Sequence, residues 1–368
     1  MTTPNKDYLR SEIEDIENVD DEEGNEDTSI SADLFTISSY GVDNPVVHLI
    51  SRLEKEIYYI PTFQRAYVWS ANDASKFIES LLLGLPVPGI FLYKESDSPR
   101  HLVIDGQQRL KSLLAFKEGL LRDRAFKLSG LKSKWDGLTF KELDEDDRIR
   151  FEDAIIHTTI FKQDAPSDNM DSVYEVFERI NTGGMKLSPQ EIRSCVAQGT
   201  FNDLLFRLNT NTKWREMFGK KSIRLKDIEL ILRFFAFLNN RDVYERPVKK
   251  FLTDFMTTNK NLSDVQRTKF EDLWNRTIDI IVDSYGAKPF RPGGRALNAA
   301  FYDSFTVAVA EELSKGNSVS KEQISKAYDA LLVDEEFVKH ISSGTSGQDS
   351  VKYRFNRAAE IVSGANAL

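Results

Sequence analysis

Residues 101–110 decide the fold of the N-terminal half, and they read His101-Leu102-Val103-Ile104-Asp105-Gly106-Gln107-Gln108-Arg109-Leu110. The first part is apolar and partly β-branched, which predicts a short buried strand that ends near Asp105. From Leu110 onward the leucines recur at helical spacing with charged residues between them, which predicts an amphipathic helix. Residues 105–109 therefore lie where a strand becomes a helix.

The start of this helix has the properties of an anion site. Free backbone N–H groups and the positive end of the helix dipole both lie there, and phosphate binds readily at such a terminus. Side chains of the first turn lean back toward the N-terminus, so Gln107, Gln108 and Arg109 can reach the same point. The structural alternative is a capped helix with Asp105 near its N-cap and no ligand. These five residues alone leave both interpretations open.

Composition bounds the class of protein. The chain has 368 residues, of which 40% are hydrophobic and 29% are charged, enough for two or three compact domains. No apolar run reaches the length of a membrane span, and the N-terminus lacks an apolar signal core. The single cysteine, Cys195, excludes an internal disulfide framework and a cysteine-based zinc site. We therefore expect a cytoplasmic protein that does not act at a membrane.

The acidic net charge of −9 is concentrated at the N-terminus. Residues 1–33 contain twelve acidic side chains against Lys6 and Arg10, so the rest of the chain is nearly neutral. Such a segment is typical of a disordered tail. A sharper hypothesis is that the tail mimics nucleic acid and shields a basic groove, or that it binds a basic partner.

An aromatic segment upstream of residues 101–110 contains a second candidate pair, Gln64 and Arg65. Residues 58–69 begin as a strand, become a loop at Pro61 and place several aromatic residues around this pair. One interpretation is that neighbouring rings fix Arg65 to meet an anion, since the guanidinium fork matches phosphate. The alternative is a hydrophobic edge segment in which Arg65 snorkels to solvent.

Around these motifs the pattern predicts a small α+β unit. A short amphipathic helix is expected after Pro45, and another begins at Ser70 with Asp73 three residues on and ends at Gly84. Strands are expected at residues 90–93 and 151–161. His157, within the last of these strands, is expected to be structural.

A polar, glycine-rich corner follows a predicted helix over residues 172–180. The next helix begins at residues 188–191 with a capping serine, a proline and a glutamate. Four polar side chains are candidates to line a cleft at this corner: Arg179, Asn181, Glu191 and Arg193. The alternative is a plain corner between two helices with surface charges.

From Phe201 onward the apolar spacing predicts helices throughout. Two basic features stand out there, a glycine-rich loop at residues 290–295 and a C-terminal helix with Lys352, Arg354 and Arg357. Both are candidates to contact a nucleic-acid backbone. The alternative is that these are ordinary solvated basic residues.

Three separated blocks together resemble one known family. They are Ile60-Pro61-Thr62-Phe63-Gln64-Arg65-Ala66-Tyr67-Val68-Trp69, then Ile104-Asp105-Gly106-Gln107-Gln108-Arg109-Leu110, then Phe177-Glu178-Arg179-Ile180-Asn181-Thr182-Gly183-Gly184 with Leu187-Ser188-Pro189-Gln190-Glu191-Ile192-Arg193. Their order and spacing resemble the N-terminal domain of GmrSD-type restriction endonucleases, which is related to the ParB/sulfiredoxin fold and occurs in bacterial anti-phage systems. The resemblance implies an α+β, ParB/sulfiredoxin-like domain over residues 34–200. An acidic tail (1–33) precedes it, and a mostly α-helical domain (201–368) follows it.

The resemblance also implies a nucleoside-triphosphate (NTP) site at the DGQQR turn, formed by Asp105, Gly106, Gln107, Gln108 and Arg109. Gln64 and Arg65 are expected beside it, and Arg179 and Asn181 are expected as further walls. In full-length members, NTP binding or hydrolysis at this turn controls DNA cleavage, and some relatives sense modified DNA such as glucosylated bases or phosphorothioate linkages.

We assign provisional roles from the chemistry of these residues. The backbone N–H groups after Gly106 are expected to hold phosphate oxygens, and Arg109 and Arg65 to neutralise the charge that develops on phosphoryl transfer. Asp105 is expected to bind Mg²⁺ or to orient water. Either Gln107 or Gln108 is expected to position that water.

Two departures from related proteins narrow the function. Sulfiredoxins have a cysteine just after the corresponding glycine, and Gln107 stands there instead, which excludes cysteine-sulfinate repair. Full-length restriction members add an HNH-type nuclease domain, whereas the four histidines here, His48, His101, His157 and His340, are widely scattered. There is also no P-loop motif.

The first hypothesis is therefore a nucleotide-dependent sensor or regulatory subunit of an anti-phage restriction system, with DNA and a separate nuclease chain as partners. The second is a stand-alone ParB-like nuclease in which carboxylates such as Asp105 and Asp73 hold metal. The third is a non-enzymatic module whose turn binds a phosphate or a partner's carboxylate.

Overall fold

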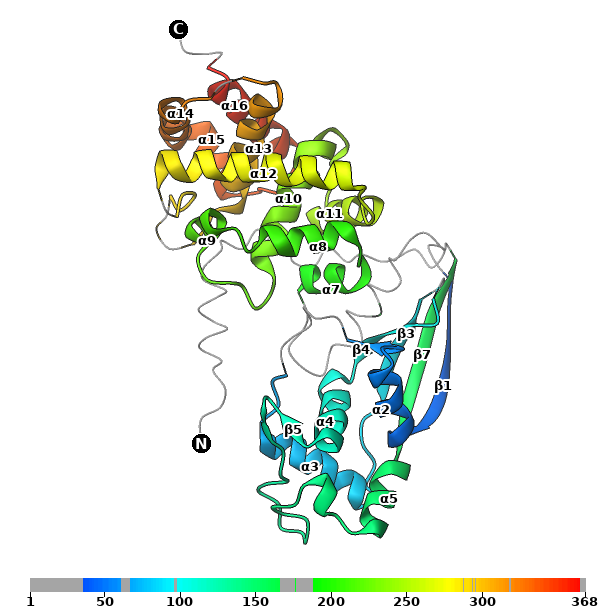
Figure 1. Cartoon of the computed structure of the whole chain (residues 1–368). Coiled ribbons are helices and arrows are strands. Elements are labelled where there is room, and N and C mark those ends of the chain that lie inside the picture. The colour runs from blue at the N-terminus through cyan, green and yellow to red at the C-terminus, as the bar shows by residue number, and fades with distance from the viewer. Residues whose placement is uncertain are drawn as a thin grey trace. The chain divides into compact units, whose positions relative to one another are not determined.

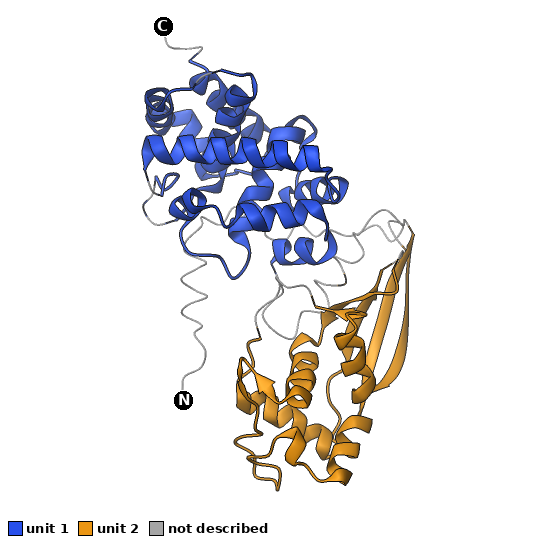
Figure 2. Ribbon diagram, in the orientation of Figure 1, with its two compact units in different colours: residues 1–29, 188–368 blue, residues 30–187 orange. Residues whose placement is uncertain are grey.

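The computed structural model describes residues 36–60, 67–95, 98–165, 176 and 188–364, apart from positions 287, 293, 295 and 318. The chain divides into two compact units, a sheet-containing unit up to Leu187 and a helical unit from Ser188 onward, each considered by itself below (Figure 2). This confirms the predicted α+β class, with a sheet domain followed by a mostly helical one. The acidic segment 1–33 lies outside the described residues.

A mixed five-stranded sheet forms the frame of the first unit (Figure 1). Its strands, in spatial order, are β1 (Thr36–Pro45), β7 (Ile155–Ala165), β3 (Ile90–Lys94), β4 (His101–Asp105) and β2 (Tyr58–Tyr59). β1 pairs antiparallel with β7, β7 parallel with β3, β3 antiparallel with β4, and β4 parallel with β2. The strand predicted from residue 151 begins at Ile155, because residues 151–153 end a helix.

Four helices belong to this unit: α2 (Val46–Glu54), α3 (Ala71–Leu82), α4 (Gln107–Glu118) and α5 (Glu145–Asp153). Two short strands, β5 (Leu120–Leu121) and β6 (Arg124–Ala125), and a 3-10 turn, η2 (Phe140–Glu142), connect α4 to α5. The helix predicted at Ser70 is confirmed, with Ser70 and Asp73 forming a reciprocal capping box. The amphipathic helix predicted after Pro45 is confirmed as α2.

One apolar core joins these helices to the sheet. Alternate residues of β3 and β7 contribute to it, namely Ile90 and Leu92 from β3, and Ile156 and Ile160 from β7. Alternation of this kind follows from the two-residue period of a strand. Phe116 of α4 lies at the centre of an aromatic group with Phe126, Phe140 and Phe151. Nδ1 of His157 donates to Oδ1 of Asp43 across the β1–β7 pair at 2.8 Å, in keeping with the structural role expected for this histidine.

The second unit is helical throughout its described length. Its elements are α7 (Pro189–Val196), α8 (Thr200–Leu208), α9 (Thr212–Phe218), α10 (Lys226–Asn240), η4 (Arg241–Val243), α11 (Val248–Thr258), α12 (Asp264–Tyr285), α13 (Ala299–Ser314), α14 (Lys321–Val333), α15 (Glu335–Ser342) and α16 (Gln348–Val362). Helix α13 is buried almost end to end and packs against α10, α12 and α16, so it is the central helix.

The boundary between the units lies before Ser188, earlier than the residue 201 expected from the sequence. Helix α7 packs with the helical unit instead of the sheet unit. Arg193 forms an ion pair with Glu229 of α10 at 2.5 Å, and Glu191 forms one with Arg224 at 3.0 Å. These two residues of α7 are buried in the helical unit, so they do not line a cleft at the predicted corner.

The two basic features of the helical region are mostly occupied by internal contacts. Arg291 donates to the carbonyls of Met217 and Phe218 at the end of α9, both at 2.9 Å. Arg354 is fully buried, and Arg357 pairs with Asp334 and Glu360. Burial excludes a contact of Arg354 with nucleic acid, while Arg291 and Arg357 are engaged within the fold. Lys352 is exposed and Arg295 lies outside the described residues, so a nucleic-acid contact at these two stays a prediction. In the described part of the chain, none of the helices combines the length and the apolar character needed to cross a membrane.

Candidate functional site

The turn at Gly106 joins β4 to α4 and is possible only for glycine. Its φ is +101°, a backbone conformation that side chains other than hydrogen rarely adopt. A Cβ added there would also lie 2.9 Å from Cγ1 of Ile90 on the neighbouring strand. Glycine thus permits both the left-handed turn and the close approach of the turn to the sheet.

Arg109 is held at this turn by two acceptors. Its Nη2 donates to Oδ2 of Asp105 at 2.6 Å and to the carbonyl of Gly89 at 2.9 Å. The arginine side chain is 14% exposed and that of Asp105 is 41% exposed, so the pair lies at the edge of the protein interior. Arg109 Nε is buried and has no acceptor among the described residues. The guanidinium is therefore fixed in place while part of its donor capacity is unused.

The N-terminus of α4 is not capped by Asp105. The N-cap residue is Gly106, which has no side chain to accept a hydrogen bond from the first turn of α4. Asp105 instead serves as the counter-ion of Arg109. Asp105 therefore lies next to the N-cap, as the structural alternative expected, but its carboxylate pairs with Arg109 and not with the helix end. The positive end of the helix dipole lies beside this pair.

Gln108 has a different environment from the one expected for a residue that positions water. Its Oε1 accepts from the backbone N–H groups of Val68 and Trp69, at 3.0 and 3.3 Å. The same segment is also held by Ser112 and by Arg122. Gln108 is thus tied to the chain that leads into α3.

Lys111, which the sequence analysis did not single out, lies one turn further along α4. Burial lowers the pKa of its ammonium group from the ordinary value of 10.5. Helix residues four apart share one face, so Lys111 lies on the same face as Gln107. It has no ion-pair partner among the described residues. A lysine at helical spacing resembles any surface lysine, so only its burial in the folded chain distinguishes it.

Several predicted site residues cannot be placed. Gln64, Arg65, Arg179 and Asn181 lie outside the described residues. The described part of the predicted site is the turn from β4 into α4, which consists of Asp105, Gly106, Gln107, Gln108 and Arg109.

The carboxylates of this unit were also candidates to bind metal. Oδ2 of Asp73 accepts from the backbone N–H and the hydroxyl of Ser70, at 3.1 and 2.7 Å, so Asp73 caps α3. Within the described ranges, no three His, Cys, Asp or Glu side chains gather as a metal cluster. Mg²⁺ that is held with a nucleotide needs only one or two carboxylates, because phosphate oxygens and water supply its other ligands. Asp105, half-exposed and beside the uncapped helix, fits that requirement.

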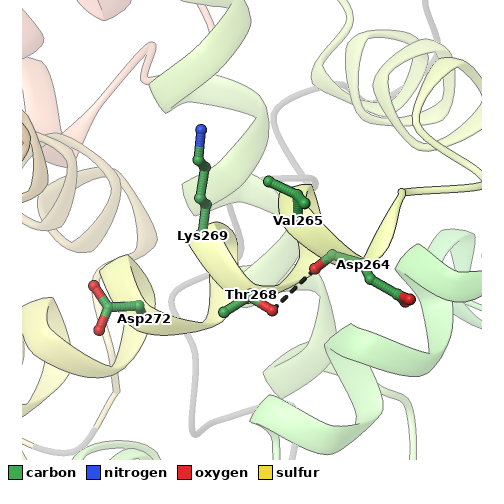
Figure 3. Close-up of a pocket in the computed structure, with 5 residues that line it drawn as sticks. All are labelled: Asp264, Val265, Thr268, Lys269 and Asp272. Atoms are coloured by element: carbon green, nitrogen blue, oxygen red, sulfur yellow. Dashed lines mark hydrogen bonds between the residues drawn. The ribbon is translucent and has the colours of Figure 1, made fainter.

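The described residues also line an open pocket on α12, remote in sequence from the DGQQR turn (Figure 3). Its lining side chains are Asp264, Val265, Thr268, Lys269 and Asp272. Thr268 donates its hydroxyl to the carbonyl of Asp264 at 2.9 Å, a bond within one helix. The lining comes from a single helix and offers no convergent polar groups, so the DGQQR turn is the better candidate.

Comparison with known proteins agrees with the sequence resemblance. No curated protein matches the chain. Residues 46–197, from the start of α2 to the end of α7, match the family model described as the GmrSD restriction endonuclease, N-terminal domain. The match includes the whole DGQQR turn. Residues 46–197 are therefore a domain similar to the N-terminal domain of GmrSD restriction endonucleases, which points to a component of a restriction system.

Proposed function

We propose that residues 105–109 form a nucleoside-triphosphate site in a DNA-sensing or regulatory component of an anti-phage restriction system. The main observation in support is that Arg109 is fixed beside the N-terminus of α4, whose N-cap residue, Gly106, has no capping side chain. A positive helix end and an oriented guanidinium favour an anion of high charge, as the phosphates of an NTP are.

The chemistry proposed for the turn is electrostatic. Backbone N–H groups of the first turn of α4 bind phosphate oxygens. Arg109 adds donors that are already oriented, because Asp105 and Gly89 hold its Nη2. Groups fixed before the reaction stabilise developing charge without a cost of reorganisation during the reaction. Lys111 contributes a second cation one turn away, and bound phosphate would favour its charged form.

Mg²⁺ is proposed as the cofactor, with Asp105 as the protein ligand. A bound Mg²⁺ would neutralise charge on the phosphates. Oδ2 of Asp105 already accepts from Arg109, so Oδ1 is the oxygen assigned to the metal. DNA and a partner nuclease remain proposed partners. Gln64, Arg65, Arg179 and Asn181 remain proposed nucleotide contacts on the strength of the family resemblance alone.

The test is to measure NTP binding and phosphate release by the purified chain. ATP, GTP, CTP and UTP are each offered with and without Mg²⁺, with calorimetry for binding and a phosphate assay for turnover. At least one NTP is expected to bind, and phosphate is expected to be released only with Mg²⁺. R109A is expected to weaken binding by about tenfold to a hundredfold, the range for losing a hydrogen bond to a charged group.

Arg276 provides a matched control. It pairs with Asp272 four residues earlier, as Arg109 pairs with Asp105, but on an exposed stretch of α12. R276A should therefore leave NTP binding and phosphate release unchanged. Failure of the wild-type chain to bind any of the four NTPs would remove the proposal.

The two alternatives have their own outcomes. NTP binding without turnover, and with R109A impaired, favours a non-enzymatic phosphate-binding module. Nicking of plasmid DNA with Mg²⁺ or Mn²⁺ alone favours the stand-alone nuclease. Asp73 gives that nuclease no support, because its carboxylate already caps α3.

A further inference from the structure

The segment that leads into α3 consists of Tyr67, Val68 and Trp69. It forms hydrogen bonds with side chains in the first turns of α4. The carbonyl oxygen of Gln108, Oε1, accepts from the N–H groups of Val68 and Trp69, at 3.0 and 3.3 Å. Both lie forty residues or nearly so from Gln108 in the chain, so this is a tertiary contact.

A second contact with this segment comes from Ser112, one turn further along α4. The buried Ser112 donates its hydroxyl proton to the carbonyl of Gln108 at 2.7 Å. That hydroxyl has only one proton, so in its 2.7 Å contact with Tyr67 it is the tyrosine that donates. Gln108 and Ser112 thus hold the backbone and the side chain of the same short segment.

A third contact with this segment comes from Arg122, in the turn between β5 and β6. Nη2 of Arg122 donates to the carbonyls of Tyr67 and Trp69, at 2.6 and 3.2 Å. Its guanidinium also lies 5.5 Å from the centre of the Tyr67 ring. The segment 67–69 is therefore held from two sides by groups that are far apart in sequence.

The two glutamines of the DGQQR turn cannot act at one point. Successive residues of a helix point about 100° apart, so Gln107 and Gln108 face different directions. The amide oxygen of Gln108 is occupied by two backbone N–H groups. Because Oε1 of Gln108 already accepts two hydrogen bonds, it is not free to accept another from an attacking water.

We propose that Gln108 is a positioning residue that fixes segment 67–69 against the phosphate-binding turn and does not itself act on substrate or water. The inference rests on the proposed NTP site. Gln108 belongs to the first turn of α4, so its contacts with segment 67–69 also fix the position of the turn that is proposed to bind phosphate. Gln108 thus orders the site without touching the substrate.

The test compares Q108A, Q108E and Q107A in the full chain, with kinetics of NTP hydrolysis and hydrogen exchange at Val68 and Trp69. Q108A removes the acceptor. It should speed exchange of those two amides by about tenfold or more and raise KM by about tenfold, with a smaller effect on kcat. Q108E retains an acceptor oxygen at the same place, so it should restore protection of the two amides. Its KM is not compared, because the added negative charge lies near the proposed phosphate site. Q107A should leave the two amides protected.

R122A provides an independent test, because it removes the hydrogen bonds to the carbonyls of Tyr67 and Trp69 without altering α4. It should raise KM in the same direction as Q108A. The inference is overturned if Q108A impairs hydrolysis while the amides of Val68 and Trp69 stay protected, because Gln108 would then act on the substrate directly. It is also overturned if Q108A exposes the amides but keeps wild-type KM and kcat. Either result leaves the NTP site itself standing, whereas a wild-type chain that binds no NTP removes both.

Discussion

Oδ2 of Asp105 lies 2.6 Å from Nη2 of Arg109, four residues later and across the turn from β4 into α4. The carboxylate that the sequence offered as a helix cap or a metal ligand is, in the folded chain, the counter-ion of the arginine beside it. The proposed roles of the two residues are therefore coupled, and each can be tested through the other.

Replacing Asp105 with asparagine should separate metal binding from phosphate binding. D105N removes the charge that Mg²⁺ requires, and it also frees the cation of Arg109 to meet phosphate. We expect Mg²⁺-dependent phosphate release to be lost, while NTP binding without Mg²⁺ stays equal or becomes tighter. Calorimetry with and without Mg²⁺ measures both. An unchanged dependence of turnover on Mg²⁺ concentration would show that Asp105 does not hold the metal.

The two glycines that bound α4 should differ in their tolerance of alanine. Gly106 and Gly119 both have positive φ, but only at Gly106 does an added Cβ meet other atoms, 2.9 Å from Ile90. G119A should cost about 1 kcal/mol of unfolding free energy from backbone strain alone. G106A should cost about 2–4 kcal/mol because overpacking adds to the strain. Urea denaturation of both variants decides this, and equal losses would contradict the steric role of Gly106.

The buried charges at the centre of the helical unit predict an unequal response to mutation. Asp303 of α13 pairs with Arg233 at 2.6 Å, and Nη2 of Arg354 lies 3.9 Å from the same carboxylate. All three side chains are almost completely buried, and burial lowers the pKa of Arg354 to about 10. Two buried cations thus share one anion.

D303N should therefore destabilise the protein by about 3–5 kcal/mol, since it removes the charge of the buried anion that faces both cations. R354M should cost less, because it leaves Arg233 and Asp303 as a neutral pair and removes an expensive buried charge. Thermal or denaturant unfolding ranks the two variants. The charge argument is wrong if R354M is the more damaging of the two.

Because Lys111 is partly buried, we expect the stability of the protein to depend on pH in the alkaline range. Burial lowers the pKa of this lysine in the folded chain below the value of 10.5. At pH values between the pKa of Lys111 in the folded chain and 10.5, the unfolded chain binds more protons than the folded chain. The contribution of Lys111 to the free energy of unfolding therefore rises with pH in this range. Below the folded pKa, the cost of burying the cation is present in full.

K111M lacks that ionisation and should be more stable than wild type at pH 7, with the difference shrinking as pH rises toward 10.5. Unfolding free energies of the two proteins at several pH values between 7 and 10 test this. Only the difference between them is compared, because other groups titrate in the same range. A difference that stays constant with pH would contradict the prediction.

The sequence specified those features that depend on residues three or four positions apart. The capping boxes at Ser70 and at Ser188 were predicted from their spacing, and both are present. The strand that ends at Asp105 and the helix that follows Gly106 were predicted in the same way. Such signals are local because the hydrogen-bonded ring at a helix end closes within one turn.

The tertiary structure decided the partners of the charged residues. Arg233 and Asp303 are seventy residues apart, and the spacing of α16 gives no sign that Arg354 is buried. The same holds at the DGQQR turn, where the sequence could not distinguish Gln107 from Gln108. Gln108 meets Val68 and Trp69 only because packing brings α4 against the segment before α3. A side chain's local spacing fixes the face on which it lies, but what lies opposite that face is set by the packing of the whole core.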